Sequence, residues 1–161
     1  MSNMVDMPRK QVPPPLELVK ERIEEIMPPD AKQRIEDGNV TVIDTRNSDR
    51  FELGHVDGSV SLPSGESARD AHGEEYAKAV EEAAGGRDAE VILFCGEGNR
   101  SARTADALKN EHGFENVNSV VGGIKLWHDL GYPIEGELAA GADEAEVAMM
   151  GLDDDGDGDT T

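Results

Sequence analysis

"VILFCGEGNRSART", residues 91–104, is the stretch that decides the fold. It opens on a short apolar run, which is typical of a strand buried on both faces of a parallel sheet. Cys95, the only cysteine in the chain, follows this run directly, and a glycine-rich turn then leads into a segment with helical spacing. Because ligands of such sheets bind beyond the carboxyl ends of the strands, this order predicts a functional site at Cys95.

The turn after Cys95 predicts a nest of backbone N–H groups at the start of a helix. Its glycines adopt backbone angles closed to other residues, so successive N–H groups can point at one anion. The helix dipole and Arg100 favour a thiolate, so we expect the Cys95 pKa below about 8.5 and a nucleophilic sulfur. The plainer interpretation is a buried apolar cysteine. The predicted loop comprises Gly96, Glu97, Gly98, Asn99, Arg100 and Ser101, of which Ser101 is expected to cap the helix.

Strands and helices are predicted to alternate along the rest of the chain. Strands are predicted at 40–44, 59–63, 90–94 and 117–121, and helices at 28–37, 48–54, 74–84, 101–112 and 123–131. Ser48 is expected to cap the helix that it opens, and glycines to end several of the others. Residues 16–27 have helical spacing and could end as a short strand near Ile26. The alternation predicts an α/β fold, a mostly parallel sheet with helices on both faces.

Composition limits the class of protein. The 161 residues suit one domain, which we place at 23–138, after an arm at 1–22 that is partly disordered and before a flexible acidic tail at 139–161. The start lacks the apolar stretch of a secretory signal, so a cytoplasmic location is expected. One cysteine excludes an internal disulfide and a thiolate metal cage.

The charge of the chain is strongly negative. Its 35 acidic and 15 basic residues give a formal net charge of −20, which argues against nucleic acid or anionic membrane as a partner. The acids are spread along the whole chain, so we expect a halophilic protein whose self-repulsion is screened by cytoplasmic salt. The alternative is an acidic mesophilic protein. Asp153, Asp155 and Asp157 resemble the start of a calcium loop, but without flanking helices we expect only weak cation condensation there.

Three ordered stretches resemble the rhodanese (sulfurtransferase) family, from about residue 24 to 137. "CGEGNRSA" resembles that family's active-site loop, Cys-x-x-Gly-x-Arg-Ser, "VIDTRNSDRFELGHVDGSVSLP" its first signature and "VVGGIKLWHDLGYPIE" its closing one. The matching positions outside the loop are Asp44, Arg46, Phe51, Gly54, His55, Gly58 and Pro63 in the first signature, and Gly122, Gly123, Trp127, Gly131 and Pro133 in the last.

The resemblance implies a single rhodanese domain with a five-stranded sheet, and a mechanism. The Cys95 thiolate would take the outer sulfur of a donor, such as thiosulfate or a persulfide, and pass it from a persulfide to a thiol or cyanide. Backbone N–H groups of residues 96–101 would stabilise that persulfide, and Arg100 would orient the donor or brace the loop. No cofactor and no metal are expected. A protein persulfide donor or a sulfur-carrier protein is a further possible partner.

Two other functions stay open, a non-catalytic rhodanese binding module and a cysteine-dependent phosphatase or arsenate reductase. Tyrosine phosphatases space the cysteine and arginine by five residues, whereas four stand between Cys95 and Arg100, which implies a tighter cradle suited to sulfur. Glu97 places a negative charge in the loop and so weakens thiosulfate as the donor.

Other residues are expected to support the site. Asp44 and Arg46 are expected to form a buried ion pair behind the loop, and Gly122 and Gly123 to allow a close backbone approach at its mouth. His55 is interpreted as a hydrogen-bonded packing residue, Trp127 as core, and the histidines show no metal-ligand spacing.

Overall fold

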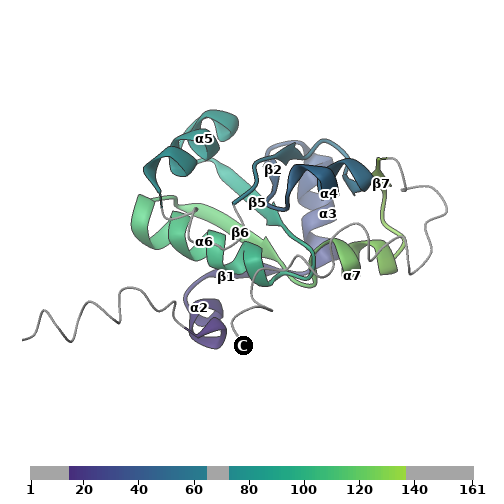
Figure 1. The fold of residues 1–161 in the computed structure, drawn as a ribbon, viewed down its shortest axis with the longest axis horizontal. Coiled ribbons are helices and arrows are strands. Elements are labelled where there is room, and N and C mark those ends of the chain that lie inside the picture. The colour runs from purple at the N-terminus through teal and green to yellow at the C-terminus, as the bar shows by residue number, and fades with distance from the viewer. Residues whose placement is uncertain (1–14, 65–72, 137–161) are drawn as a thin grey trace, which may run out of the picture.

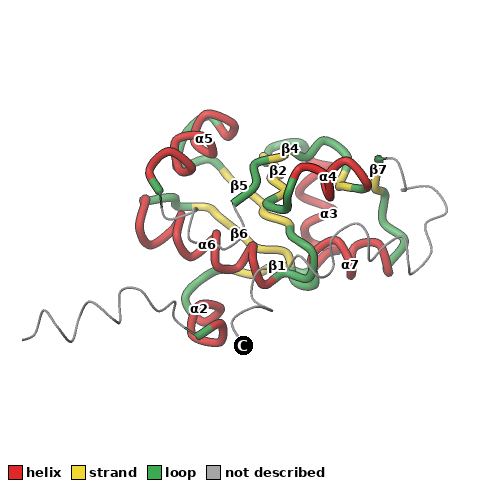
Figure 2. Tube along the Cα trace, viewed as in Figure 1, coloured by secondary structure: helices red, strands yellow, loops and turns green. Residues whose placement is uncertain are grey.

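The central feature is a five-stranded parallel sheet. A computed structural model describes residues 15–64 and 73–136, and its strands lie in the order β1-β6-β5-β2-β4 (Figure 1, with β4 labelled in Figure 2). This confirms the predicted α/β fold. The strands of this sheet are β1 (Glu24–Ile26), β2 (Thr41–Asp44), β4 (Val60–Ser61), β5 (Glu90–Phe94) and β6 (Asn116–Val120).

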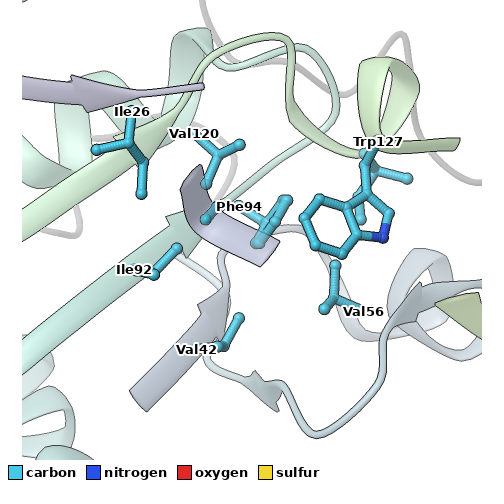
Figure 3. Packing of buried hydrophobic residues seen from close by; sticks show 9 residues of the cluster. Ile26, Val42, Val56, Ile92, Phe94, Val120 and Trp127 are labelled. Atoms are coloured by element: carbon cyan, nitrogen blue, oxygen red, sulfur yellow. The ribbon is translucent and has the colours of Figure 1, made fainter. Parts of the chain in front are cut away.

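The apolar run of β5 reflects burial on both faces of the sheet. β5 pairs with β2 and β6, and its side chains alternate between two cores. Ile92 and Phe94 enter one core, which Figure 3 shows converging with Trp127, and Val91 and Leu93 enter the other. The first core is closed by α3 (Pro28–Asp37) and α7 (Gly123–Asp129), and the second by α5 (Glu74–Ala84) and α6 (Asn99–His112).

Several predicted boundaries are confirmed. Pro28 opens α3, and the glycines predicted to end α3, α5 and α6 adopt left-handed conformations there, at Gly38, Gly85 and Gly113. The segment at 16–27 divides into a helix, α2 (Leu16–Glu21), and the edge strand β1. The sequence allowed this alternative, a helical segment that ends as a short strand near Ile26.

Two predicted caps are wrong. The helix predicted from residue 101 begins at Asn99 after Gly98, so Ser101 lies inside its first turn. The φ of +99° at Gly98 lets the chain turn sharply enough to start the helix early. In α4 (Ser48–Leu53), Ser48 is the first helical residue, Asn47 is the N-cap, and no side-chain cap bond forms.

The sequence missed a short antiparallel ribbon. β3 (His55–Val56) pairs with β7 (Ile134–Glu135) outside the main sheet (Figure 2). Two residues are too few to show alternation, which explains why no strand was predicted.

Within the predicted arm, α2 packs against α6. Val19 of α2 is fully buried, and Arg22 donates two hydrogen bonds of 2.8 Å to the Asp106 carboxylate. The predicted tail at 139–161 and its aspartates lie outside the described residues.

Candidate active site

The site forms where the parallel strands end. Thr45, just after β2, bonds to the last residue of β5, because both its backbone N–H (2.9 Å) and its hydroxyl (3.0 Å) donate to the Phe94 carbonyl. This contact sets the end of β2 beside Cys95. The loops that leave this edge therefore bring together residues far apart in the sequence (Figure 2).

The Cys95 sulfur lies in a nest of donors. The Gly98 N–H donates to Sγ at 3.1 Å and the Ser101 N–H at 3.2 Å, while Sγ lies 3.3 Å from the Ser101 hydroxyl. The Ser101 N–H is one of the first amides of α6, which have no partner within the helix. The Cys95 sulfur therefore accepts the hydrogen bond that a side-chain oxygen accepts at an ordinary N-cap, the role that the sequence assigned to Ser101. Such donors stabilise a negative charge on sulfur.

A serine on β6 extends this nest. The Ser119 hydroxyl lies 2.8 Å from the Ser101 hydroxyl, and both residues are fully buried. Sequence reasoning did not single out Ser119. The available signal was a small polar residue between two valines of a short predicted strand, since a buried hydroxyl needs a partner.

The glycines at the start of α7 let that helix touch the loop. The N–H of Ile124 donates to the Cys95 carbonyl at 2.9 Å, and that of Lys125 to the Gly96 carbonyl at 3.0 Å. Gly123, at φ +57°, lies so close that a Cβ there would be 2.5 Å from the Cys95 oxygen. Gly122 is the N-cap of α7, also at positive φ (+78°). Two helix N-termini therefore hold the loop, α6 through the sulfur and α7 through the carbonyls.

A buried ion pair lies behind the loop. The Arg46 guanidinium donates to both carboxylate oxygens of Asp44, at 3.0 and 2.8 Å, and to the Gly54 carbonyl at 2.6 Å. Both side chains are almost wholly buried. The pair thus fixes the end of β2 against the turn after α4, one residue from Thr45.

Arg100 points into the protein rather than to its surface. It is only 2% exposed, in the first turn of α6. Burial raises the pKa of Tyr76, the Asp44 carboxylate raises it further, and the Arg100 guanidinium opposes them, so both charged groups lie near this ring. The Tyr76 hydroxyl donates to the Leu62 carbonyl at 2.6 Å.

Glu97 is the exposed member of the loop. Among residues 95–101 it alone is exposed, Asn99 is half-buried, and the others are buried. Cys95 itself is 0% exposed, so a reagent reaches its sulfur only when surrounding groups move.

The other residues singled out lie at the edges of the site or in the core. His55 stacks on Phe51 and its Nδ1 lies 2.6 Å from the Phe51 carbonyl, whereas Trp127 is buried against Phe94. Within residues 15–64 and 73–136, no three His, Cys, Asp or Glu side chains gather as a metal site would require. The helices of the described part are too short or too polar to cross a membrane.

Comparison with known protein families identifies the family of the chain. The model of the rhodanese-like domain matches residues 27–130, from the start of α3 to the end of α7. The chain belongs to the rhodanese-like domain family. The matched span of this rhodanese-like chain contains the sulfur nest, the buried ion pair and the glycines at the start of α7.

Relatives of this rhodanese-like chain have different roles. Thiosulfate sulfurtransferase GlpE from Pseudomonas aeruginosa is 31% identical over 117 residues, which cover 73% of this chain and 94% of that enzyme. The tRNA uridine(34) hydroxylase of Pectobacterium carotovorum is 34% identical over 89 residues, 55% of this chain but 23% of the hydroxylase. The chain therefore spans under a quarter of that enzyme.

Solved structures support the same fold. A protein of unknown function from Rhodopseudomonas palustris, described as a possible tyrosine phosphatase, has a TM-score of 0.60 at 27% identity, covering 74% of this chain and 90% of that chain. The rhodanese-like domain of an Anabaena protein has a TM-score of 0.58 at 22% identity, with 74% and 87% covered.

Proposed function

We propose that this rhodanese-like domain is a sulfurtransferase that carries a sulfur atom on Cys95 as a persulfide. The observation that carries the proposal is the pair of backbone donors, the N–H groups of Gly98 and Ser101, aimed at Sγ at 3.1 and 3.2 Å. Thiosulfate sulfurtransferase relatives that align over almost their whole length support it.

The reaction has two displacements at sulfur. In the first, the Cys95 thiolate attacks the outer sulfur of the donor and forms a new S–S bond, the donor's own bond to that sulfur breaks, and the remainder of the donor leaves with the electron pair. From thiosulfate the leaving group is sulfite, and from a persulfide it is a thiolate. In the second, an acceptor thiolate or cyanide attacks the outer sulfur of Cys95–S–S⁻ and regenerates the thiolate. The enzyme needs no net oxidation or reduction.

The loop residues take different parts in this scheme. The two N–H donors stabilise the anionic sulfur in both the thiolate and the persulfide state. Because Arg100 is buried, its role is to brace the loop rather than to bind the incoming sulfur donor. The Asp44–Arg46 pair holds the end of β2 behind the loop. Gly122 and Gly123 keep α7 close enough to bond the loop carbonyls.

The donor is proposed to be a persulfide, on a small thiol or on a protein. Glu97 is the exposed charge of the loop, and it repels the thiosulfate dianion more than a monoanionic or neutral donor. We also propose a cytoplasmic location and a salt-rich environment, for which the net charge of −20 is the support.

Intact-mass measurement tests the proposal. The protein is incubated in high salt with thiosulfate or with a small-thiol persulfide, and a gain of one sulfur atom is expected. Cyanide should remove it, and Cys95→Ser should never acquire it. If neither donor gives an adduct, the sulfurtransferase proposal is rejected and the non-catalytic binding module remains.

A cysteine-dependent phosphatase is the second candidate, because the Rhodopseudomonas palustris protein is described as a possible tyrosine phosphatase. The four-residue spacing between Cys95 and Arg100 speaks against it. Hydrolysis of an aryl phosphate by the wild type, lost in Cys95→Ser, would establish this activity instead.

A further inference from the structure

A chain of three buried groups leads from the reactive sulfur into the sheet. Cys95 Sγ lies 3.3 Å from the Ser101 hydroxyl, which lies 2.8 Å from the Ser119 hydroxyl on β6. All three residues are fully buried. The chain links the first turn of α6 to a strand that ends at the same sheet edge as β5.

Ser119 occupies a position where an apolar residue would be expected. In the sheet register it stands beside Leu93 of β5, and Val117, two residues earlier on the same face, belongs to the core under α5 and α6. A hydroxyl in such a place is costly unless it has a hydrogen-bond partner. The partner that the structure gives it is Ser101, which also contacts the sulfur.

We propose that Ser119 is a positioning residue for sulfur transfer, acting through Ser101. Either hydroxyl of the pair can be the donor. When Ser119 donates to Ser101, the proton of Ser101 is left to point at Sγ, and an anionic sulfur gains an O–H donor beside its two N–H donors. This inference rests on the proposed function, because that reaction passes through a thiolate and a persulfide anion.

Without Ser119, the Ser101 hydroxyl loses the partner that orients it. A serine in a helix can instead turn its hydroxyl to a backbone carbonyl one turn earlier, which takes the donor away from sulfur. The expected consequence is a less stable anion on Cys95. Ser119 thus tunes the nucleophile without touching it.

The test is the pH dependence of Cys95 alkylation by iodoacetamide, measured without any sulfur donor. Because the sulfur is buried, opening of the site scales the plateau rate, whereas ionisation sets the midpoint. Ser119→Ala is expected to raise the midpoint by about half a pH unit to one unit. Ser101→Ala should raise it at least as much, and Ser101→Ala with Ser119→Ala no further than Ser101→Ala alone.

Two matched variants separate the hydroxyl from the packing. The threonine of Ser119→Thr and the valine of Ser119→Val have the same shape and differ only in the hydroxyl. A wild-type midpoint in the first variant and a raised midpoint in the second would show that the hydroxyl, not the packing, sets the midpoint. Asn118→Val, on the opposite face of the same strand, should leave the midpoint unchanged. Circular dichroism and thermal melts confirm that each variant is folded.

Two outcomes would overturn the inference. One is a wild-type midpoint in both Ser119→Ala and Ser119→Val. The other is a shift from Ser119→Ala that persists in the Ser101→Ala background, since that effect would not pass through Ser101. Failure of the proposed function is a separate result, namely no persulfide on the wild type while the midpoint shift is still present.

Discussion

At the scale of single residues, the conformation of the loop depends on glycines more than on charged groups. Gly98 lets α6 begin early enough to aim the Ser101 amide at Sγ, and Gly123 lets the first amides of α7 bond the Cys95 and Gly96 carbonyls. Gly98 therefore brings two backbone donors to the sulfur, and Gly123 brings α7 to the loop carbonyls. Backbone donors of this kind are fixed before the substrate arrives, which is what stabilisation of an anion requires.

Gly123→Ala tests this dependence on backbone. A Cβ at Gly123 would meet the Cys95 oxygen at 2.5 Å, and the positive φ adds about 1–2 kcal/mol of strain for an alanine. The loop must shift, so we expect at least a tenfold loss of persulfide formation in the intact-mass assay. Gly131→Ala is the matched control, because Gly131 has a φ of +78° with nothing within 4 Å of its Cβ position. Equal losses in both variants would show that strain alone, not the contact, is responsible.

Glu97→Gln tests the charge at the loop. Removing the exposed carboxylate should raise the rate with thiosulfate several-fold at low salt, because repulsion of the dianion falls. The gain should shrink in molar salt, where screening already removes most of the repulsion. Rates with a neutral persulfide donor should change little. A thiosulfate rate that does not respond would mean that Glu97 plays no part in donor choice.

At the scale of elements, most helices and strands were predictable, and the two-residue strands β3 and β7 were not. β5 and α5 have enough residues for apolar spacing to show, and their predicted bounds are confirmed. The start of α6 was misplaced by two residues. The sequence assigned the N-cap to the Ser101 hydroxyl, whereas the Ser101 N–H itself donates a hydrogen bond to Cys95 Sγ. The Cys95–Arg100 loop was visible as a motif, but Ser119 was not, since its role depends on a strand pairing that the sequence does not state.

The β3–β7 ribbon carries a pH-dependent contact between acidic groups. The pKa of Glu135 is raised by the hydrogen bond that its protonated carboxyl donates to Asp57 and by the negative charge of Asp57, whereas His55 lowers it. A carboxyl whose folded pKa is raised binds its proton more tightly in the folded state. Its contribution to stability therefore grows as pH falls through that pKa and is lost as pH rises.

Glu135→Gln tests this contact. The neutral amide should raise the unfolding temperature slightly at pH 7, and the gain over wild type should vanish below about pH 4, where glutamate is protonated. Glu115→Gln, at an exposed site outside the ribbon, measures the general benefit of removing one acid from this chain. If both variants gain equally at every pH, the ribbon contact contributes nothing of its own.

At the scale of the whole molecule, the dominant feature is the excess of negative charge. Ion pairs such as Arg34–Glu90 and Arg87–Glu74 join exposed or half-buried side chains and stabilise little each. The net charge of −20 acts across the entire surface, and its self-repulsion opposes the compact state. Salt weakens both effects, but it has more repulsion than attraction to remove.

The unfolding temperature should therefore rise steadily as potassium chloride increases from tens of millimolar to molar concentrations. Most of the rise should come below about 0.2 M, where the screening length falls fastest, if general screening is the cause. A continued rise above 1 M would point to specific cation binding by the acidic surface. Sucrose at matched osmolality serves as the control for effects that do not depend on charge. A cooperative melt whose midpoint is the same with and without salt would reject the halophilic interpretation while leaving the fold and the sulfur chemistry as they are.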